Sequence, residues 1–296
     1  MILSPITHSE EVVHIKDLDT NKIIDLYRRD FGIDVIPELG NFPQIGMYQC
    51  KSSLLRFYAH YEEIAGKDAF YCQLAQKYAS YYSEDKWEFN AVLPYFKKKS
   101  KVLEIGSGNG YFLDKLKKLQ IKDITGLEIS SDAAKTCQQK GHQVINSPIE
   151  DLNEEKTYDV ICSFQIFEHL PNVDATLLKS IKLLEKDGLL MISVPNNLSL
   201  LFSLDPYHTL NLPPHHVMLW DEISLRKIAK LYDLEVVDIL KSEATISEKS
   251  RIYKLQLVGI FGSFFGSVFH TLTRFWAKNL MGQRYGAAII AIYRKK

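Results

Sequence analysis

Val102-Leu-Glu-Ile-Gly-Ser-Gly-Asn-Gly110 is the stretch that decides the fold. A short apolar run, Val102–Ile105, ends at a glycine-rich turn, and a helical pattern follows. The lack of a Cβ at Gly106, Gly108 and Gly110 allows the backbone to approach a ligand closely. A helix that begins after such a loop also points unpaired N–H groups at that ligand. The stretch predicts a binding loop for an adenosine-containing molecule.

The spacing of the glycines separates two kinds of adenosine ligand. A dinucleotide loop follows G-x-G-x-x-G, which would place its third glycine at Tyr111. Here the pattern is G-x-G-x-G, with the acid Glu104 two residues before it, so a nicotinamide site is excluded. A second acid, Glu128, closes the next predicted strand, where a carboxylate can accept hydrogen bonds from both ribose hydroxyls.

The alternation of short β-branched runs with longer helical stretches predicts βαβ units. We expect an α/β fold with a Rossmann-like, seven-stranded, doubly wound sheet over residues 87–296. Residues 1–86 are expected to form a helical, aromatic-rich N-terminal cap. The predicted strands are Val102–Ile105, Ile124–Glu128, Gln143–Asn146, Tyr158–Ser163, Gly188–Val194, Leu234–Leu240 and Ala287–Tyr293.

The E-x-G-x-G-x-G loop, the acid at Glu128 and the run Tyr158-Asp-Val-Ile-Cys-Ser163 before a helix resemble class I S-adenosylmethionine (SAM)-dependent methyltransferases. The resemblance covers roughly 87–296 and is strongest over 102–196. It implies SAM as cofactor and S-adenosylhomocysteine as product. It places Glu128 on the ribose and Ile129 on the adenine. The implied cofactor-binding residues are Glu104, Gly106, Ser107, Gly108, Gly110, Glu128, Ile129, Ile149, Ser163 and Phe164.

The chain departs from this family at the adenine end of the site. Family members commonly have an acid after the third strand, and this sequence has Pro148 at that position. The N–H of Ile149 can still meet the adenine ring. Ser147 and Glu150 are the candidates to replace the missing acid at the adenine amino group.

Two clusters follow the fourth and fifth strands, where a methyl acceptor is expected. Methyl transfer requires alignment of the acceptor and, for a hydroxyl, removal of its proton. The first cluster is Glu168 and His169. These residues either supply a catalytic base or have the structural role of capping a turn. The second, His215 and His216, follows a Pro-Pro kink that aims both rings. We predict that the catalytic residues are His215, His216, His169 and Glu168.

The same residues suggest a divalent-metal set, namely Glu168, His169 and one of His215 or His216. A Glu-x-x-Glu-His segment with later histidines is similar to metal-dependent small-RNA 2′-O-methyltransferases and to ubiquinone-pathway O-methyltransferases. This sequence has Gln165 in place of the first acid, and an amide is a poorer ligand than a carboxylate. We therefore assign no metal to the site.

Composition limits the classes of partner. The chain has 36 basic and 36 acidic residues, so a nucleic-acid partner is not favoured. Its four cysteines are scattered and form no C-x-x-C pair, which favours a reducing, cytoplasmic location. The start of the chain is too interrupted to be a signal peptide.

Two segments lie outside the expected methyltransferase core. The cap is rich in aromatic residues, which either pack internally or bring Tyr81 or Tyr82 to the cofactor cleft. Residues 256–273, within an insertion at about 252–280, carry no charge. Since the strands on either side belong to one sheet, a single membrane span is excluded. The insertion is either a hydrophobic lid, packed on the domain or in a homodimer, or a surface for peripheral membrane contact; Arg274, Lys278 and Arg284 flank it.

The sequence as a whole predicts O-methylation of a carbohydrate or small-molecule hydroxyl. The aromatic cap, Ser193-Val-Pro-Asn196 and the Pro-Pro-His-His run are loosely similar to bacterial methyltransferases that modify sugars. Two alternatives stay open: an RNA 2′-O-methyltransferase that uses a divalent metal, and a non-catalytic module that binds the cofactor to hold a partner.

Overall fold

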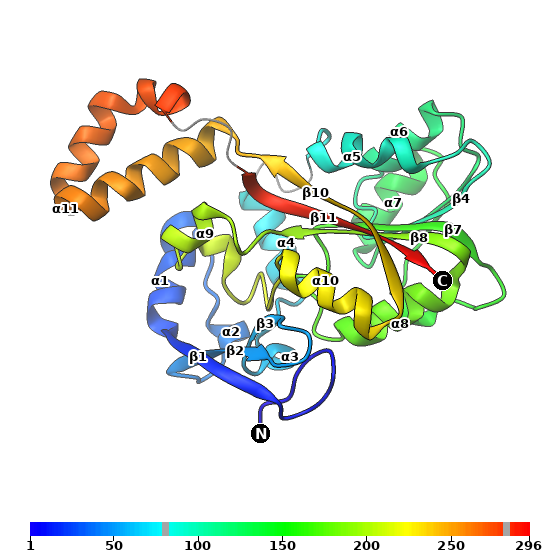
Figure 1. The fold of residues 1–296 in the computed structure, drawn as a ribbon, viewed down its shortest axis with the longest axis horizontal. Coiled ribbons are helices and arrows are strands. Elements are labelled where there is room, and N and C mark those ends of the chain that lie inside the picture. Colours follow the sequence, from blue (N-terminus) through cyan, green and yellow to red (C-terminus); the bar gives the residue numbers. More distant parts are fainter. Residues whose placement is uncertain (79–82, 281–284) are drawn as a thin grey trace.

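In a computed structural model of the chain, a seven-stranded sheet forms the centre of the molecule (Figure 1). The structure describes residues 1–78, 83–280 and 285–296, of which 274–280 and 285 are described by their backbone. The strand order is β10-β11-β8-β7-β4-β5-β6; β11 runs antiparallel to both of its neighbours. The strands are β4 (Lys101–Ile105), β5 (Asp123–Leu127), β6 (Val144–Ile145), β7 (Tyr158–Phe164), β8 (Leu184–Pro195), β10 (Leu234–Glu243) and β11 (Tyr285–Lys295).

Helices cover both faces of this sheet, which confirms the predicted doubly wound α/β fold. One hydrophobic core holds side chains of α5, α6 and α7, and the other holds side chains of α8, α10 and the N-terminal region. Because both faces are buried, the central strands are almost continuously apolar, as in Val160-Ile-Cys162. The helices are α5 (Trp87–Val92), α6 (Tyr111–Lys118), α7 (Ser131–Gln139), α8 (Val173–Leu183), α9 (Leu200–Leu204), α10 (Glu222–Leu231) and α11 (Ile246–Leu280).

The N-terminal region contains a second sheet that the helical-cap prediction did not include. Its order is β1-β2-β3-β9, and all three pairings are antiparallel. The strand β9 comes from the segment between β8 and α10, so the cap is completed by a distant part of the chain. The predicted boundary at residue 86 stays a prediction. The elements are β1 (Val12–Asp19), α1 (Thr20–Phe31), α2 (Ile36–Leu39), β2 (Gln44–Cys50), β3 (Arg56–Tyr58), α3 (Tyr61–Ile64), α4 (Asp68–Lys77) and β9 (Met218–Leu219).

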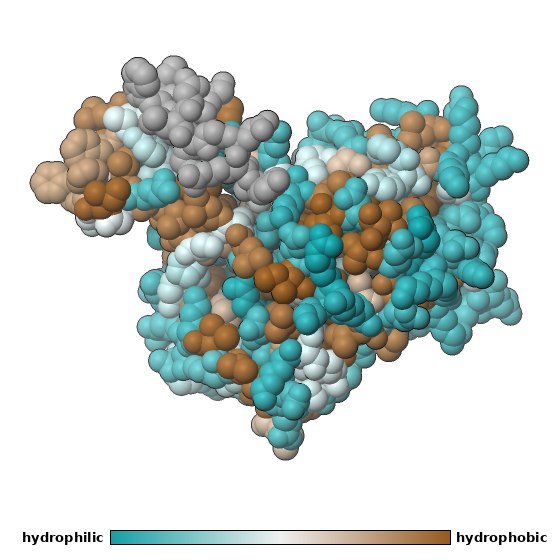
Figure 2. Space-filling view, in the orientation of Figure 1, coloured by the Kyte–Doolittle hydropathy of each residue, from teal (hydrophilic) through white to brown (hydrophobic). Residues whose placement is uncertain are grey.

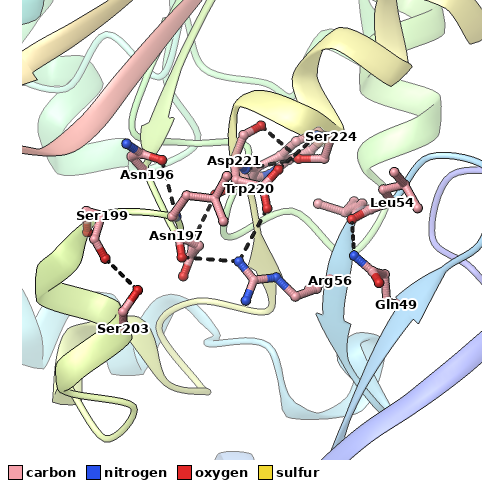
Figure 3. A network of polar contacts seen from close by, with 12 residues as sticks. Gln49, Leu54, Arg56, Asn196, Asn197, Ser199, Ser203, Trp220, Asp221 and Ser224 are labelled. Atoms are coloured by element: carbon pink, nitrogen blue, oxygen red, sulfur yellow. Dashed lines mark hydrogen bonds and ion pairs between the residues drawn. The ribbon is translucent and has the colours of Figure 1, made fainter. Parts of the chain in front are cut away.

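A buried polar network fastens β3 to the start of α10 (Figure 3). The Arg56 guanidinium donates to the carbonyl oxygen of Asn197 at 3.2 Å and lies 3.3 Å from Asp221 Oδ2. Asp221 also caps α10, because its Oδ1 accepts from the Ser224 N–H at 2.8 Å. The Asn197 side chain donates to the carbonyl oxygen of Trp220. One aspartate therefore supports both the helix and the contact with the cap.

We expect Asp221→Ala to destabilise the protein by about 1–3 kcal/mol, because it removes the cap of α10 and the partner of Arg56. Asp221→Asn retains an oxygen that can cap the helix and removes only the charge, so its loss should be clearly smaller. Urea unfolding followed by circular dichroism measures both values. Equal losses in the two variants would contradict the capping role.

Candidate functional site

The glycine loop adopts a conformation that only glycine takes readily. Gly106, Gly108 and Gly110 have φ angles of 75°, 50° and 79°. A Cβ at Gly106 would collide with the side chain of Ile166, which follows β7. The N–H groups of Gly106 and Ser107 both donate to the carbonyl oxygen of Leu127, at 2.9 and 2.8 Å. The loop is thereby anchored to β5 and packed against the segment after β7.

Glu128 is tied directly to this loop. Its carboxylate accepts hydrogen bonds from the N–H of Gly108 at 2.7 Å and from the N–H of Ser130 at 2.8 Å. Each carboxylate oxygen keeps a further lone pair that can accept from a ribose hydroxyl. The next side chain, Ile129, is 63% exposed and can lie against an adenine face. The geometry fits the roles that the sequence predicted for both residues.

Glu104 carries a buried carboxyl group at the end of β4. The residue is 2% exposed, and its Oε2 has no hydrogen-bond partner among the described residues. Burial raises the pKa of Glu104 to about 8, Lys86 opposes this rise, and Glu128 adds to it. A buried carboxylate without a partner is costly, and a cation beside it removes that cost. SAM bears both an ammonium and a sulfonium group, so Glu104 fits this cofactor.

We expect the affinity for SAM to rise with pH between about 6 and about 8. Below its raised pKa, Glu104 must lose a proton before it can pair with a cation, so binding is coupled to proton release at up to tenfold per pH unit. Isothermal titration in buffers of different ionisation enthalpy measures both affinity and released protons. In Glu104→Gln, the affinity for SAM should vary with pH only through the titration of the ligand's own amine. If the affinity of this variant has the same pH dependence as that of the wild type, the coupling is refuted.

Two predicted cofactor ligands have side chains that face elsewhere. The Ser107 hydroxyl lies over β5, where a Cβ on Gly126 would come within 2.7 Å of it. The Phe164 ring packs in the core against Phe89 and Phe112, with centroids 5.1 and 4.7 Å away. Their backbones can still flank the cofactor, and the predicted part of Ser107 and Phe164 in binding it stays a prediction. The Ser163 hydroxyl is buried and has no hydrogen-bond partner among the described residues, so Ser163 stays a candidate.

At the adenine end of the site, one carboxyl oxygen of Glu150 is already engaged. Glu150, a proposed substitute for the missing acid, accepts hydrogen bonds from Asn172 and from Thr176 in α8. It therefore fastens α8 to the loop after β6. Ile149 is buried beside it, and the predicted contact of its N–H with adenine stays a prediction.

Three histidines converge near the carboxyl ends of β7 and β8. One ring nitrogen from each of His169, His215 and His216 lies within 4.8 Å of the other two. The rings of His215 and His216 are stacked, with centroids 4.4 Å apart. The backbone joins the two predicted clusters, because the carbonyl oxygen of Glu168 accepts from the N–H groups of Val217 and Met218. The structure thus unites residues that the sequence separates by more than forty positions.

The hydrogen bonds of these rings select one tautomer. Nδ1 of His169 meets the carbonyl oxygen of His215, and Nδ1 of His215 meets that of Leu210. Nδ1 of His216 meets Oδ1 of Asn211 at 3.1 Å. Since all three acceptors are oxygens, each Nδ1 carries the proton and each Nε2 presents a lone pair. Each ring therefore offers its Nε2 as a proton-accepting nitrogen.

Burial controls the protonation of this cluster. It lowers the pKa of His169 to about 4 and the pKa values of His215 and His216 well below the usual 6.5. It raises the pKa of Glu168 to about 8. Glu168 Oε1 lies 3.8 Å from His169 Nε2, and neither carboxyl oxygen has a hydrogen-bond partner among the described residues. At neutral pH the histidines are therefore uncharged.

The cap holds the histidine loop in place. The Tyr71 hydroxyl donates to the carbonyl oxygen of His215 at 3.4 Å, and its ring meets His169 edge-on at 5.6 Å. The Tyr27 hydroxyl donates to the carbonyl oxygen of Leu212 at 2.9 Å. Neither tyrosine carries a sequence signal that predicts this role. The tyrosines predicted from the sequence, Tyr81 and Tyr82, lie outside the described residues.

A cavity of about 510 Å³ lies at the same edge of the sheet. Gln165 lines it and donates to Glu88 Oε1 at 3.1 Å and to Ser193 Oγ at 3.0 Å. An acid in place of Gln165 would face Glu88 with a like charge, which accounts for the amide at this position. The opposite wall comes from the end of β10, the start of β11 and the start of α11.

The histidines also form a set that can bind a divalent metal, since neutral imidazoles are common ligands. Glu168, the acid of the metal set considered from the sequence, does not belong to this group. The prediction that the site uses no metal stays a prediction, which activity after exhaustive chelation tests directly.

Comparison with known proteins identifies the family. The sequence profile described as "Methyltransferase domain" matches residues 75–239, which is more than half of the chain. The chain belongs to this family. It is a SAM-dependent methyltransferase with a class I fold.

Curated relatives of the methyltransferase include ubiquinone biosynthesis O-methyltransferases. The protein from Candida albicans is 30% identical over 105 residues, which cover 32% of each chain. The one from Pelagibacter ubique is 27% identical over 151 residues, or 49% of this chain and 60% of that protein. The methyltransferase therefore matches less than two thirds of the length of these relatives.

A solved structure supports the fold of the methyltransferase. A SAM-dependent methyltransferase from Archaeoglobus fulgidus superposes with a TM-score of 0.53 and 21% identity, over 76% of this chain and all of that one. At this identity the likeness concerns the fold alone.

Proposed function

We propose that the protein transfers the methyl group of SAM to a hydroxyl group of a small molecule. The observation that carries the proposal is the convergence of three histidine rings after β7 and β8, with one ring nitrogen of each within 4.8 Å of the other two. Ile166, packed against Gly106, links the two parts of the site: it follows β7 and precedes Glu168 and His169 by two and three residues.

The roles of the residues follow from their positions. Bound SAM supplies a methyl group already activated on a sulfonium. Glu104 and Glu128 hold the donor, while the glycine loop shapes the floor on which it lies. A histidine Nε2 accepts the hydrogen bond of the acceptor hydroxyl and takes its proton as the new O–C bond forms and the S–C bond breaks. Neutral histidines suit this step because a protonated ring has no lone pair to offer.

Oxygen as the acceptor atom has independent support in the relatives, several of which are named O-methyltransferases. A carbohydrate acceptor is the narrower proposal, and it rests on the likeness of Ser193-Val-Pro-Asn196 and Pro213-Pro-His-His216 to sugar-modifying enzymes. The 510 Å³ cavity has the size of a small-molecule site, although its lining includes Gln165 and none of the three histidines.

Transfer of a radiolabelled methyl group from SAM tests the proposal. The acceptors offered are simple phenols, monosaccharides, nucleotide sugars and a short RNA, and the product linkage is read by its resistance to mild acid and base. We expect an ether product from a phenol or a sugar. Labelling of RNA alone would favour the 2′-O-methyltransferase alternative. Tight SAM binding without transfer to any acceptor would favour the non-catalytic module.

A further inference from the structure

The helix α11 forms a hairpin that stands away from the body of the molecule (Figure 1). Its backbone turns at Gly262, with φ 77° and ψ 168°, and this divides it into two arms. The arms are joined by contacts of Ser250 with His270 at 3.0 Å and of Tyr253 with Thr273 at 2.9 Å. At Gly266 the arms approach so closely that a Cβ would lie 2.6 Å from the Cα of Val258. We call residues 246–273 the apolar hairpin.

The free end of the apolar hairpin is covered with exposed large apolar side chains (Figure 2). Their exposed fractions lie between 42% and 72%, which corrects the interpretation of this insertion as a lid packed on the domain. Exposure of so many apolar side chains to water is unfavourable in free energy. Such a surface marks a site of contact with a membrane or with another apolar surface. The residues are Ile260, Phe261, Phe264, Phe265, Val268 and Phe269, and Leu272 is exposed nearer the base of the second arm.

The charge of this region has one sign. After Glu248 the chain contains no Asp or Glu, although the whole protein has 36 acidic and 36 basic residues. The uncharged stretch 256–273 is bordered by Lys254 on the first arm and by Arg274 in the sequence that follows. Arg251 pairs with Asp205, while Lys254 is exposed. An apolar tip whose uncharged stretch is bordered in the sequence by basic residues is complementary to an anionic lipid surface.

The dimensions fit one leaflet of a bilayer. Gly262 lies eight positions after Lys254, which at a rise of 1.5 Å per residue is about 12 Å. One leaflet of the hydrocarbon core is about 15 Å thick. By length and composition, 246–273 passes as a membrane span. The pairing of β10 with β11, for example Leu240 with Ile290, returns both arms to the same side.

We propose that the apolar hairpin docks the protein on anionic membranes by inserting its tip into one leaflet. Thr245 and Glu248, at the base of the first arm, line the cavity at the carboxyl edge of the sheet. Docking then places this cavity near the lipid surface, where an amphipathic acceptor is available. That last step rests on the proposed function, whereas the docking itself does not.

Flotation of the full-length protein with lipid vesicles tests the docking without acceptor or methyl donor. Vesicles contain phosphatidylcholine alone or with 30% phosphatidylglycerol. We expect the protein to float with the anionic vesicles. The double variant Phe264→Ser/Phe265→Ser should have a vesicle partition coefficient at least tenfold lower. Leu178→Ser is the matched control, because Leu178 is an exposed apolar residue of α8. Unchanged SAM binding by each variant shows that it is folded.

Three results would overturn the proposal. The first is a wild-type protein that does not float with either vesicle. The second is undiminished flotation of the double phenylalanine variant. The third is a wild-type protein that does not bind vesicles but forms a dimer, and a double variant that is monomeric. That result would assign the exposed apolar face to a contact with a second copy of the chain.

Discussion

Replacing Glu128 with glutamine is expected to weaken SAM binding by at least about 100-fold. The carboxylate has two tasks: it accepts from the N–H groups of Gly108 and Ser130, and it is placed to accept from the ribose hydroxyls. Hydrogen bonds to a charged group contribute roughly 1.5–3 kcal/mol each. The glutamine amide has no charge, and its NH₂ group faces one of the two backbone N–H donors. Hydrogen bonds to the loop and to the ribose are therefore both weakened.

Isothermal titration of the folded variant with SAM and with S-adenosylhomocysteine measures this loss. Both ligands carry the same ribose, so both affinities should fall alike. Glu155→Gln is the control, because Glu155 is exposed and lies outside the site. A Glu128→Gln variant that binds within threefold of the wild type would show that the ribose is held elsewhere.

Replacing His215 and His216 together with asparagine is expected to reduce methyl transfer by roughly 100- to 10,000-fold, the range of general acid–base catalysis. Asparagine suits this test because its amide nitrogen can occupy the position of Nδ1 and donate to the same oxygen, Leu210 O or Asn211 Oδ1. The variant therefore keeps the anchoring hydrogen bonds and removes only the Nε2 lone pairs. SAM affinity should stay within about threefold.

Single-turnover assays with saturating SAM distinguish loss of chemistry from loss of binding. His60→Asn is the matched control: His60 is exposed in the cap and has φ 57°, a conformation that asparagine tolerates. His169→Asn tests the third member of the cluster in the same way. Full transfer by the double variant would restrict the histidines to a structural role.

The central sheet was predictable because its sequence pattern is local and strong. Strands buried on both faces are continuous apolar runs, and the loop between β4 and α6 is marked by three glycines with positive φ. Glu128 followed from its position at the end of β5. Each of these signals lies within a few residues of the feature that it predicts.

The cap sheet was not predictable for the opposite reason. The apolar side chains of Val13 and Ile15 in β1 are exposed. The alternation of apolar and polar residues along this strand therefore does not indicate which face is buried. β9 has only two residues, and its partner strand β3 lies far away in the sequence. Pairings of this kind depend on the tertiary structure, and no local pattern encodes them.

The details of the site that the sequence left open have a simple geometric origin. Adjacent residues of a strand point to opposite faces, so the side chains of Ser163 and Phe164 face different surroundings. The position of Tyr71 on α4 depends on how the cap packs, which its helical spacing alone does not specify. The sequence brought the two histidine clusters to one edge of the sheet but did not predict the cap side chains that meet them there.

The completion of the cap sheet by β9 has a consequence for the order of events during synthesis. Phe57 pairs with Met218, so the outer edge of β3 lacks this partner until most of the methyltransferase sheet has left the ribosome. At 5–20 residues per second this delay is on the order of ten seconds. β9 begins two residues after His216, so the same pairing helps to fix the histidine loop. A nascent chain of this protein should therefore acquire its glycine loop well before its histidine loop.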